Sequence, residues 1–287
     1  MFQERSEKMI EIASTTDSEF TDVLLTSYVS LLENNPAEEF RFNIIDDELT
    51  DTDKKRLDSL THIYPNCQEI IFLGNDFAGV YHGANVVSPR SVIKENTYYR
   101  LEFPKLVDRP RLLYLDCDMI CRGKISTLFH NELHDNIIGA VESQMYVDRL
   151  DILGVKHQFP FYFNAGLLLI DTKKWNEHQI TAQAQKYMRD HSDIIAFQDQ
   201  DTLNAVLADQ WKPLNPKYNV QSPLMRHEKQ SLDPKQRQAA TVALKDPTLI
   251  HYTGFSKPWI TQGEYVSPWR DEYYKYQKIM FEKVGRR

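Results

Sequence analysis

The stretch Leu112-Leu-Tyr-Leu-Asp-Cys-Asp-Met-Ile120 carries the strongest fold signal in this chain. An apolar run typical of a buried strand ends in two carboxylates separated by one residue. Side chains at positions i and i+2 of a strand face the same way, so Asp116 and Asp118 can converge on one cation while Cys117 points into the core. Because two adjacent like charges repel, the pair suits a bound Mg²⁺ or Mn²⁺. From this motif alone, a solvated strand end is an equally good interpretation.

The sequence before this strand alternates short apolar runs with helical patterns. It predicts strands at 9–14, 39–46 and 68–73, and helices at 21–34 and 50–63, with Thr50 and Asp53 in capping positions. This βαβαβ order favours parallel strands with helices on both faces of the sheet. A ligand site is then expected at the carboxyl ends of the strands, where the strand order reverses.

The sequence beyond residue 89 continues the α/β pattern less regularly. It predicts a helix at 96–106, a strand at 111–116, a loop entering a buried strand within 159–170, and helices at 173–189 and 199–209. Prolines at positions 213, 216, 223, 234 and 247 limit regular sheet in the region after Trp211. The fold class is therefore α/β, with a central sheet flanked by helices.

Composition sets limits on the class of protein. The 287 residues are 41% hydrophobic and 26% charged, as in a globular protein with a full core. A net charge of −7 makes nucleic acid a poor partner. Three scattered cysteines indicate reduced thiols and a cytoplasmic location. Charged residues at 4–8 argue against a signal peptide, and the longest uncharged stretch, 159–170, is shorter than the roughly 20 residues of a membrane span.

Three further clusters carry polar groups suited to ligand binding. In His251-Tyr-Thr-Gly-Phe-Ser-Lys-Pro-Trp259, the imidazole offers a metal ligand, Gly254 lets backbone amides approach an anion, and Lys257 offers a charge for phosphate. In the apolar run 161–170, Asn164 must find hydrogen-bond partners, and Gly166 permits close approach to the backbone. A packed strand with a bulge explains that run equally well.

The last cluster, Phe197-Gln-Asp-Gln-Asp-Thr-Leu-Asn204, opens a predicted helix. Taken alone, Asp199 or Asp201 is best explained as a helix cap or as a charge favoured by the positive end of the helix.

Together these clusters resemble glycosyltransferase family 8, the retaining nucleotide-sugar transferases that include lipopolysaccharide galactosyltransferases and glycogenin. The resemblance rests on motifs in a fixed order along most of the chain: the first strand and its loop, then 97–101, 115–118, 163–166, 198–201 and 251–259. It implies a GT-A fold, which is a Rossmann-like single domain over 1–287 with a mixed central sheet flanked by helices. Residues 1–125 would form the nucleotide-binding part, and 126–287 the acceptor side and the C-terminal metal and diphosphate segment.

The resemblance also implies roles for individual residues. Asp116, Asp118 and His251 would bind Mn²⁺, with Mg²⁺ as the alternative. Around the donor, Gly254 and Lys257 would bind the diphosphate and Asp17 the uracil. Arg100 would reach the donor sugar or phosphate, and the sugar pocket would include Asn164 and Ala165. The implied donor is UDP-galactose or UDP-glucose, and the acceptor a glycan, glycolipid or glycoprotein, with segments 144–160 and 217–247 on the acceptor side.

The resemblance places Asp199 and Gln200 near the anomeric carbon, as the catalytic pair. An amide is a poor nucleophile, so we favour attack from the face that the leaving group vacates, with Gln200 stabilising the oxocarbenium-like state. A double displacement through a covalent sugar on Asp199 is the alternative. The chain departs from the family pattern at Ser18-Glu19-Phe20, where Asp-Asn-Tyr is common, and at Glu142-Ser143, where an Asp often contacts the sugar.

Two other functions fit parts of the sequence. In a haloacid dehalogenase-like phosphohydrolase, Asp116 would be the nucleophile and Asp118 the acid. That motif normally closes the first strand of its domain, whereas here three predicted strands precede it. A non-catalytic nucleotide-sugar-binding protein is the second alternative, motivated by the altered first loop.

Overall fold

The computed structural model describes residues 9–84, 94–143, 148–225, 233–254, 257–260 and 267–286. Parts of the predicted segments 74–89, 144–160, 217–247 and 251–259 lie outside these ranges.

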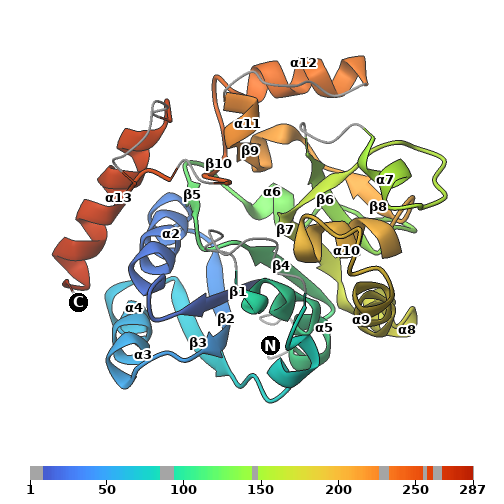
Figure 1. Cartoon of the computed structure of the whole chain (residues 1–287). Helices are drawn as coiled ribbons and strands as arrows, with labels where there is room; N and C mark the ends of the chain where they lie inside the picture. The colour runs from blue at the N-terminus through green and yellow to red at the C-terminus, as the bar shows by residue number, and fades with distance from the viewer. Residues whose placement is uncertain are drawn as a thin grey trace.

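A seven-stranded mixed sheet forms the centre of the molecule (Figure 1). Its strand order is β3 (Cys67–Leu73), β2 (Glu39–Asp47), β1 (Met9–Asp17), β4 (Arg111–Leu115), β7 (Phe163–Asp171), β6 (Ile138–Glu142) and β8 (Trp211–Pro213). The first four strands are parallel, and β7 runs antiparallel to both of its neighbours. The strand order reverses between β1 and β4, which is where the sequence analysis expects the ligand site.

Helices from the βαβαβ segment cover one face of this sheet. They are α2 (Thr21–Asn34), α3 (Asp51–Asp58) and α4 (Leu60–Ile63), packed over an apolar core that includes Ile12, Leu24 and Phe42. The capping box at Thr50 and Asp53 is confirmed. The single helix predicted over 50–63 is wrong: it divides at Ser59, whose hydroxyl donates to the Arg56 carbonyl at 2.6 Å and competes with helical hydrogen bonding.

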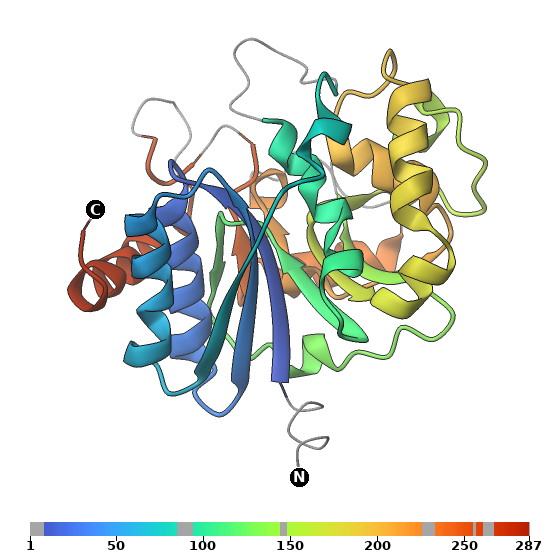
Figure 2. The ribbon, with the colours of Figure 1, turned by 90° about the horizontal axis from the view of Figure 1, so that it is seen from below.

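The opposite face carries a second apolar core under shorter helices (Figure 2). These are η1 (Ala78–Tyr81), η2 (Glu95–Leu101), α5 (Phe103–Leu106), α8 (Thr172–Glu177), α9 (Ile180–Asp190) and α10 (Gln198–Val206). The helix predicted over 96–106 is instead a 3₁₀ segment followed by one α-helical turn, because Pro104 lacks the amide hydrogen that a continuous helix needs. The helix predicted over 173–189 is also wrong: it breaks at Gln179, which has φ 53°.

A small second sheet joins distant parts of the chain, in the order β5 (Met119–Cys121), β10 (Leu249–His251), β9 (Val220–Gln221). Its register pairs His251 with Met119, so β10 lies beside the residues that follow β4. The strands after Trp211 are short, as the prolines predicted.

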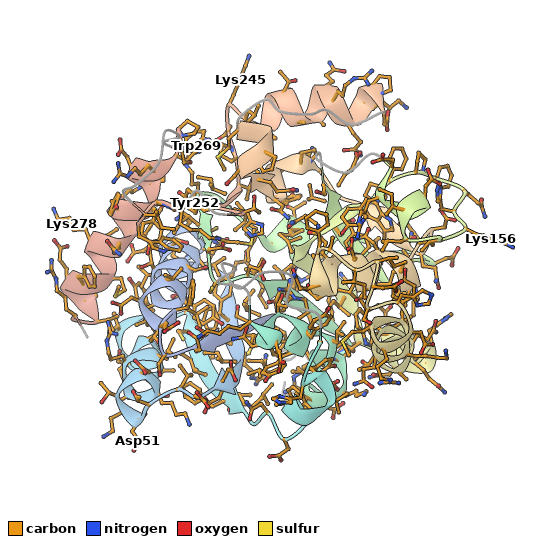
Figure 3. All side chains as sticks on the ribbon, in the orientation of Figure 1. Asp51, Lys156, Lys245, Tyr252, Trp269 and Lys278 are labelled. Atoms are coloured by element: carbon orange, nitrogen blue, oxygen red, sulfur yellow. The ribbon has the colours of Figure 1, made fainter. Side chains whose placement is uncertain are left out.

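The remaining elements are α6 (Ser126–Phe129), α7 (Arg149–Ile152), η3 (Pro216–Tyr218), α11 (Ser222–Met225), α12 (Pro234–Ala243) and α13 (Arg270–Lys283). Helix α13 lies outside α2 (Figures 1 and 2) and contacts it. Figure 3 labels Tyr252 and Trp269 where the chain passes from the small sheet toward α13, and the Tyr252 hydroxyl donates to the Trp269 carbonyl at 2.7 Å. None of the helices in the described ranges is both long and apolar enough to cross a membrane.

Candidate active site

Asp116, Asp118 and His251 form one cluster whose ligand atoms all lie within 4.8 Å of one another. The predicted convergence of the two carboxylates is confirmed, but the predicted reason is wrong. Strand β4 ends at Leu115 and β5 begins at Met119, so the two aspartates occupy the turn that joins the two sheets rather than alternate positions of one strand. His251 reaches them through the antiparallel pairing of β10 with β5.

The cluster has the geometry of a cation site. His251 Nε2 lies 3.1 Å from Asp118 Oδ1 and 3.5 Å from Asp116 Oδ2. Asp118 Oδ1 is buried and has no hydrogen-bond partner among the described residues. Such an atom costs free energy unless a ligand satisfies it. Two carboxylates and one imidazole facing one another fit a divalent metal ion.

Gly166 is required by this packing. A Cβ at this position would overlap His251 Cε1 and would lie 2.5 Å from Asp116 Oδ2. Only glycine leaves the space in which the imidazole and the carboxylate approach each other. The expectation of a close approach at this glycine, drawn from its place in an apolar run, is confirmed.

Cations hold the two carboxylates in their ionised form. Burial alone would raise the pKa of Asp116, but Arg100, whose Nη2 lies 3.0 Å from Asp116 Oδ1, and His251 hold it below its usual range. Burial opposes ionisation of Asp118 as well, and Lys257, which contacts its Oδ2, and His251 lower the pKa of that carboxyl. Burial lowers the pKa of His251, but the two aspartates outweigh it and the pKa is raised.

Arg100 joins this cluster to Asp199. Its Nε lies 2.9 Å from Asp199 Oδ2, and its Nη1 donates to the Ala165 carbonyl at 2.7 Å. The Thr97 hydroxyl donates to Asp199 Oδ1. Burial raises the pKa of Asp199 to about 6, even though Arg100 and Thr97 act in the opposite direction. The interpretation of Asp199 as a helix cap is therefore wrong: its carboxylate faces Arg100.

Asp201 instead binds the backbone directly before α10. Its Oδ2 accepts from the backbone amides of Ala196 and Phe197 at 2.7 and 2.9 Å. Between the two aspartates, Gln200 Oε1 accepts from Asn164 Nδ2 at 2.8 Å and from the Ala165 amide at 3.1 Å. Asn164 thus finds the partners that its apolar surroundings require. The structure brings Asp199, Gln200, Asn164 and Ala165 together beside the cluster of Asp116, Asp118 and His251.

A pocket opens next to the cluster at the carboxyl ends of β1 and β4. The residues that line it include Asp17, Phe20, Lys94, Asn96, Thr97, Arg100, Tyr114, Asp116, Cys117 and Lys257. Asp17 Oδ1 accepts from the amides of Glu19 and Phe20 at 3.0 and 3.1 Å, and Asp17 Oδ2 lies 2.8 Å from Lys94 Nζ. Cys117 is half-buried: it packs against the apolar core, as expected, and it also lines this pocket.

Gly254 follows the cluster at φ 72°, with no heavy atom within 4 Å of a Cβ built there. Its backbone takes up a conformation that glycine adopts without strain. Lys257 Nζ donates to the Tyr252 carbonyl at 2.7 Å, which holds this cation at the pocket wall. Phe255 and Ser256, between them, lie outside the described residues.

Two residues of this site are missing from the sequence analysis. Asn219 is fully buried between His251 and Asn164, and Lys94 pairs with Asp17. The signal for Asn219 is an amide between Tyr218 and Val220, two apolar residues in a segment of short strands. Lys94 carries no local signal, because an isolated lysine in a polar loop is ordinary.

Comparison with known proteins identifies the family. The model of glycosyl transferase family 8 matches residues 11–263. General stress protein A of Bacillus subtilis is 31% identical over 278 residues, covering 95% of this chain and 94% of the relative. Lipopolysaccharide glucosyltransferase WaaO of Escherichia coli is 29% identical, covering 91% and 79%. Lipopolysaccharide 1,3-galactosyltransferase of Salmonella typhimurium is 29% identical, covering 88% and 74%.

Among solved structures, galactosyltransferase LgtC in complex with donor and acceptor sugar analogues superposes with a TM-score of 0.84 at 22% identity, covering 94% of this chain and 96% of that one. A second structure of LgtC carries a glutamine-to-glutamate substitution in its active site. The likeness shows that this chain has the GT-A fold, so the expected fold is confirmed. None of these matches is a phosphohydrolase.

Proposed function

The chain belongs to glycosyltransferase family 8, and from that premise we propose that it is a retaining enzyme that moves a hexose from a UDP-sugar to a glycan or glycoconjugate. The names of its relatives support glucose or galactose as the hexose and a lipopolysaccharide-like glycan as one class of acceptor. We place the reaction in the cytoplasm.

One observation carries this proposal: His251 Nε2, Asp116 Oδ2 and the buried Asp118 Oδ1 converge on one point beside the pocket. We assign these three residues as ligands of a divalent metal, and the mixed oxygen and nitrogen ligands favour Mn²⁺ over Mg²⁺. When bound, the metal would act as a Lewis acid that stabilises the charge developing on the leaving diphosphate.

Different residues around the cluster would bind different parts of the donor. Lys257, at the pocket wall beside Asp118, and the backbone at Gly254 would bind the diphosphate. Asp17, at the end of β1, would bind the uracil, with Lys94 as its neighbouring charge. Arg100, Asn164 and Ala165, which lie between the cluster and α10, would hold the sugar.

Retention of the anomeric configuration is proposed to follow same-face attack. Both oxygens of Asp199 are engaged, one by Arg100 and one by Thr97, so this carboxylate is poorly placed to attack carbon. Gln200 would stabilise the oxocarbenium-like state, a role consistent with the active-site glutamine substituted in LgtC. A diphosphate oxygen would accept the proton from the acceptor hydroxyl.

A screen of UDP-sugars for hydrolysis, with and without Mn²⁺, tests the proposal without knowledge of the acceptor. We expect release of UDP from UDP-galactose or UDP-glucose, and its loss when a chelator removes the metal. UDP binding without turnover of any donor or acceptor mixture would instead favour a non-catalytic binding protein. Equal hydrolysis with and without metal would contradict the assignment of the ligands.

A further inference from the structure

A chain of side-chain amides connects the metal cluster to Gln200. His251 Nδ1 lies 3.0 Å from Asn219 Oδ1, Asn219 Nδ2 donates to Asn164 Oδ1 at 2.9 Å, and Asn164 Nδ2 donates to Gln200 Oε1 at 2.8 Å. Asn219 is completely buried, and it follows η3 directly before β9, the strand that pairs with β10. The small sheet therefore fixes Asn219 against the imidazole.

Two backbone amides of β7 set the direction of this chain. A backbone N–H can only donate, so the atoms that accept from it must be oxygens. The Gly166 amide donates to Asn164 Oδ1 at 3.1 Å, and the Ala165 amide donates to Gln200 Oε1 at 3.1 Å. These two bonds decide which end of each side-chain amide carries oxygen, a choice that is otherwise ambiguous for Asn and Gln.

The direction of these hydrogen bonds also fixes the tautomer of His251. Because Asn164 Oδ1 accepts, Asn219 must turn its nitrogen toward Asn164 and its oxygen toward the imidazole. An amide oxygen cannot donate, so His251 Nδ1 must carry the hydrogen. In the neutral imidazole the lone pair is then on Nε2, the nitrogen that faces Asp116 and Asp118.

We propose that Asn219 is a positioning residue that holds His251 in the tautomer that binds metal and links this ligand to Gln200 through Asn164. The inference rests on the metal site of the proposed function. Partners of this kind orient a histidine ligand and increase its basicity. Reversing Asn219 would place two oxygens against each other at Asn164, so the backbone of β7 prevents the wrong tautomer.

Mn²⁺ binding without any donor tests this inference, with free Mn²⁺ measured by electron paramagnetic resonance. For Asn219→Leu we expect a Kd roughly 10- to 100-fold above that of the wild type, the range typical of lost outer-shell partners. The matched control is Asn66→Leu, which removes a buried amide directly before β3, the edge strand of the seven-stranded sheet. This variant should leave the Kd unchanged. An unchanged Kd for folded Asn219→Leu would overturn the inference.

Asn219→Asp keeps the test decisive if the leucine variant does not fold. One carboxylate oxygen still accepts from His251 Nδ1, so the Kd for Mn²⁺ should stay at or below the wild-type value. The other oxygen opposes Asn164 Oδ1, so turnover should fall by roughly tenfold or more, as for a mispositioned catalytic group. A Kd for Mn²⁺ above the wild-type value in this variant would overturn the inference. If the wild type binds no Mn²⁺, the metal site itself fails, which is a distinguishable result.

Discussion

Arg100 lies between carboxylates whose pKa values move in opposite directions. Asp116 and Asp118 are held below their usual range, whereas Asp199 is raised to about 6. All three are desolvated, so burial does not explain the difference. Asp116 and Asp118 both face an additional cationic group, His251, and Asp118 also faces Lys257. Asp199, in contrast, shares Arg100 with Asp116 and accepts from one hydroxyl.

This difference in pKa distinguishes the β4–β5 turn from the start of α10. The cluster at the β4–β5 turn keeps its carboxylates charged, ready to bind a cation. The carboxylate at the start of α10 is neutralised more easily and is fixed by its neighbours. We therefore assign ion binding to the first region and positioning around the anomeric carbon to the second.

The largest expected effect is that of Asp118→Asn. The variant loses the charge that faces both Lys257 and His251, so we expect turnover of the UDP-sugar to fall by about 10³-fold or more, as for removal of a principal electrostatic group. Circular dichroism should show an unchanged fold. Asp53→Asn, at a buried aspartate in the capping box of α3, is the control and should lower stability without lowering turnover. Near-normal activity of Asp118→Asn would refute the metal role.

Gly166→Ala tests whether the space inside the cluster matters. The added methyl group would displace His251 or Asp116, so we expect weaker Mn²⁺ binding and turnover lower by on the order of 10²-fold, as for a catalytic group moved by about 1 Å. Calorimetric titration with Mn²⁺ measures the first effect. Gly79→Ala is the control, because a Cβ at that position has no heavy atom within 4 Å. Unchanged Mn²⁺ affinity in Gly166→Ala would show that the cluster is not the ion site.

Asp199→Asn tests the second region through pH. The folded-state pKa of Asp199, about 6, lies above the unfolded value, so the folded state binds this proton more tightly and the group lowers stability as pH rises from about 4 through 6. Between pH 4 and pH 7 the wild type should lose about 2 kcal/mol more stability than the variant. Urea unfolding at pH 4, 5, 6 and 7 measures the difference. If the free energies of unfolding of the wild type and the variant change with pH in parallel, the raised pKa of Asp199 is contradicted.

Gln200→Ala should have the smallest effect. Gln200 does not carry the leaving-group charge, so we expect turnover to fall by roughly 10- to 50-fold, less than the loss of a group that stabilises developing charge directly. Mass spectrometry of this variant with donor checks the route, since a sugar trapped covalently on Asp199 would replace same-face attack by double displacement.

Periodicity alone was sufficient to predict the βαβαβ unit, because each of its elements buries an apolar face regularly along the chain. It failed at Ser59, Pro104 and Gln179, where one side chain or one φ angle interrupts a helix that the apolar pattern continues. Strands β4 and β7 were both predictable, because apolar runs between polar segments identify them.

The sequence by itself determined which residues could bind a metal and a nucleotide sugar: Asp-x-Asp after a strand, a histidine with glycine and lysine, and asparagine in an apolar run. Only the tertiary structure decided that these groups meet, because β10 pairs His251 with Met119, far earlier in the chain, and also pairs with β9. It also decided the role of Asn219 and the direction of the amide chain, since hydrogen-bond direction depends on donors from a different strand. Local sequence records residue chemistry, whereas the partner of each group is a property of the packed fold.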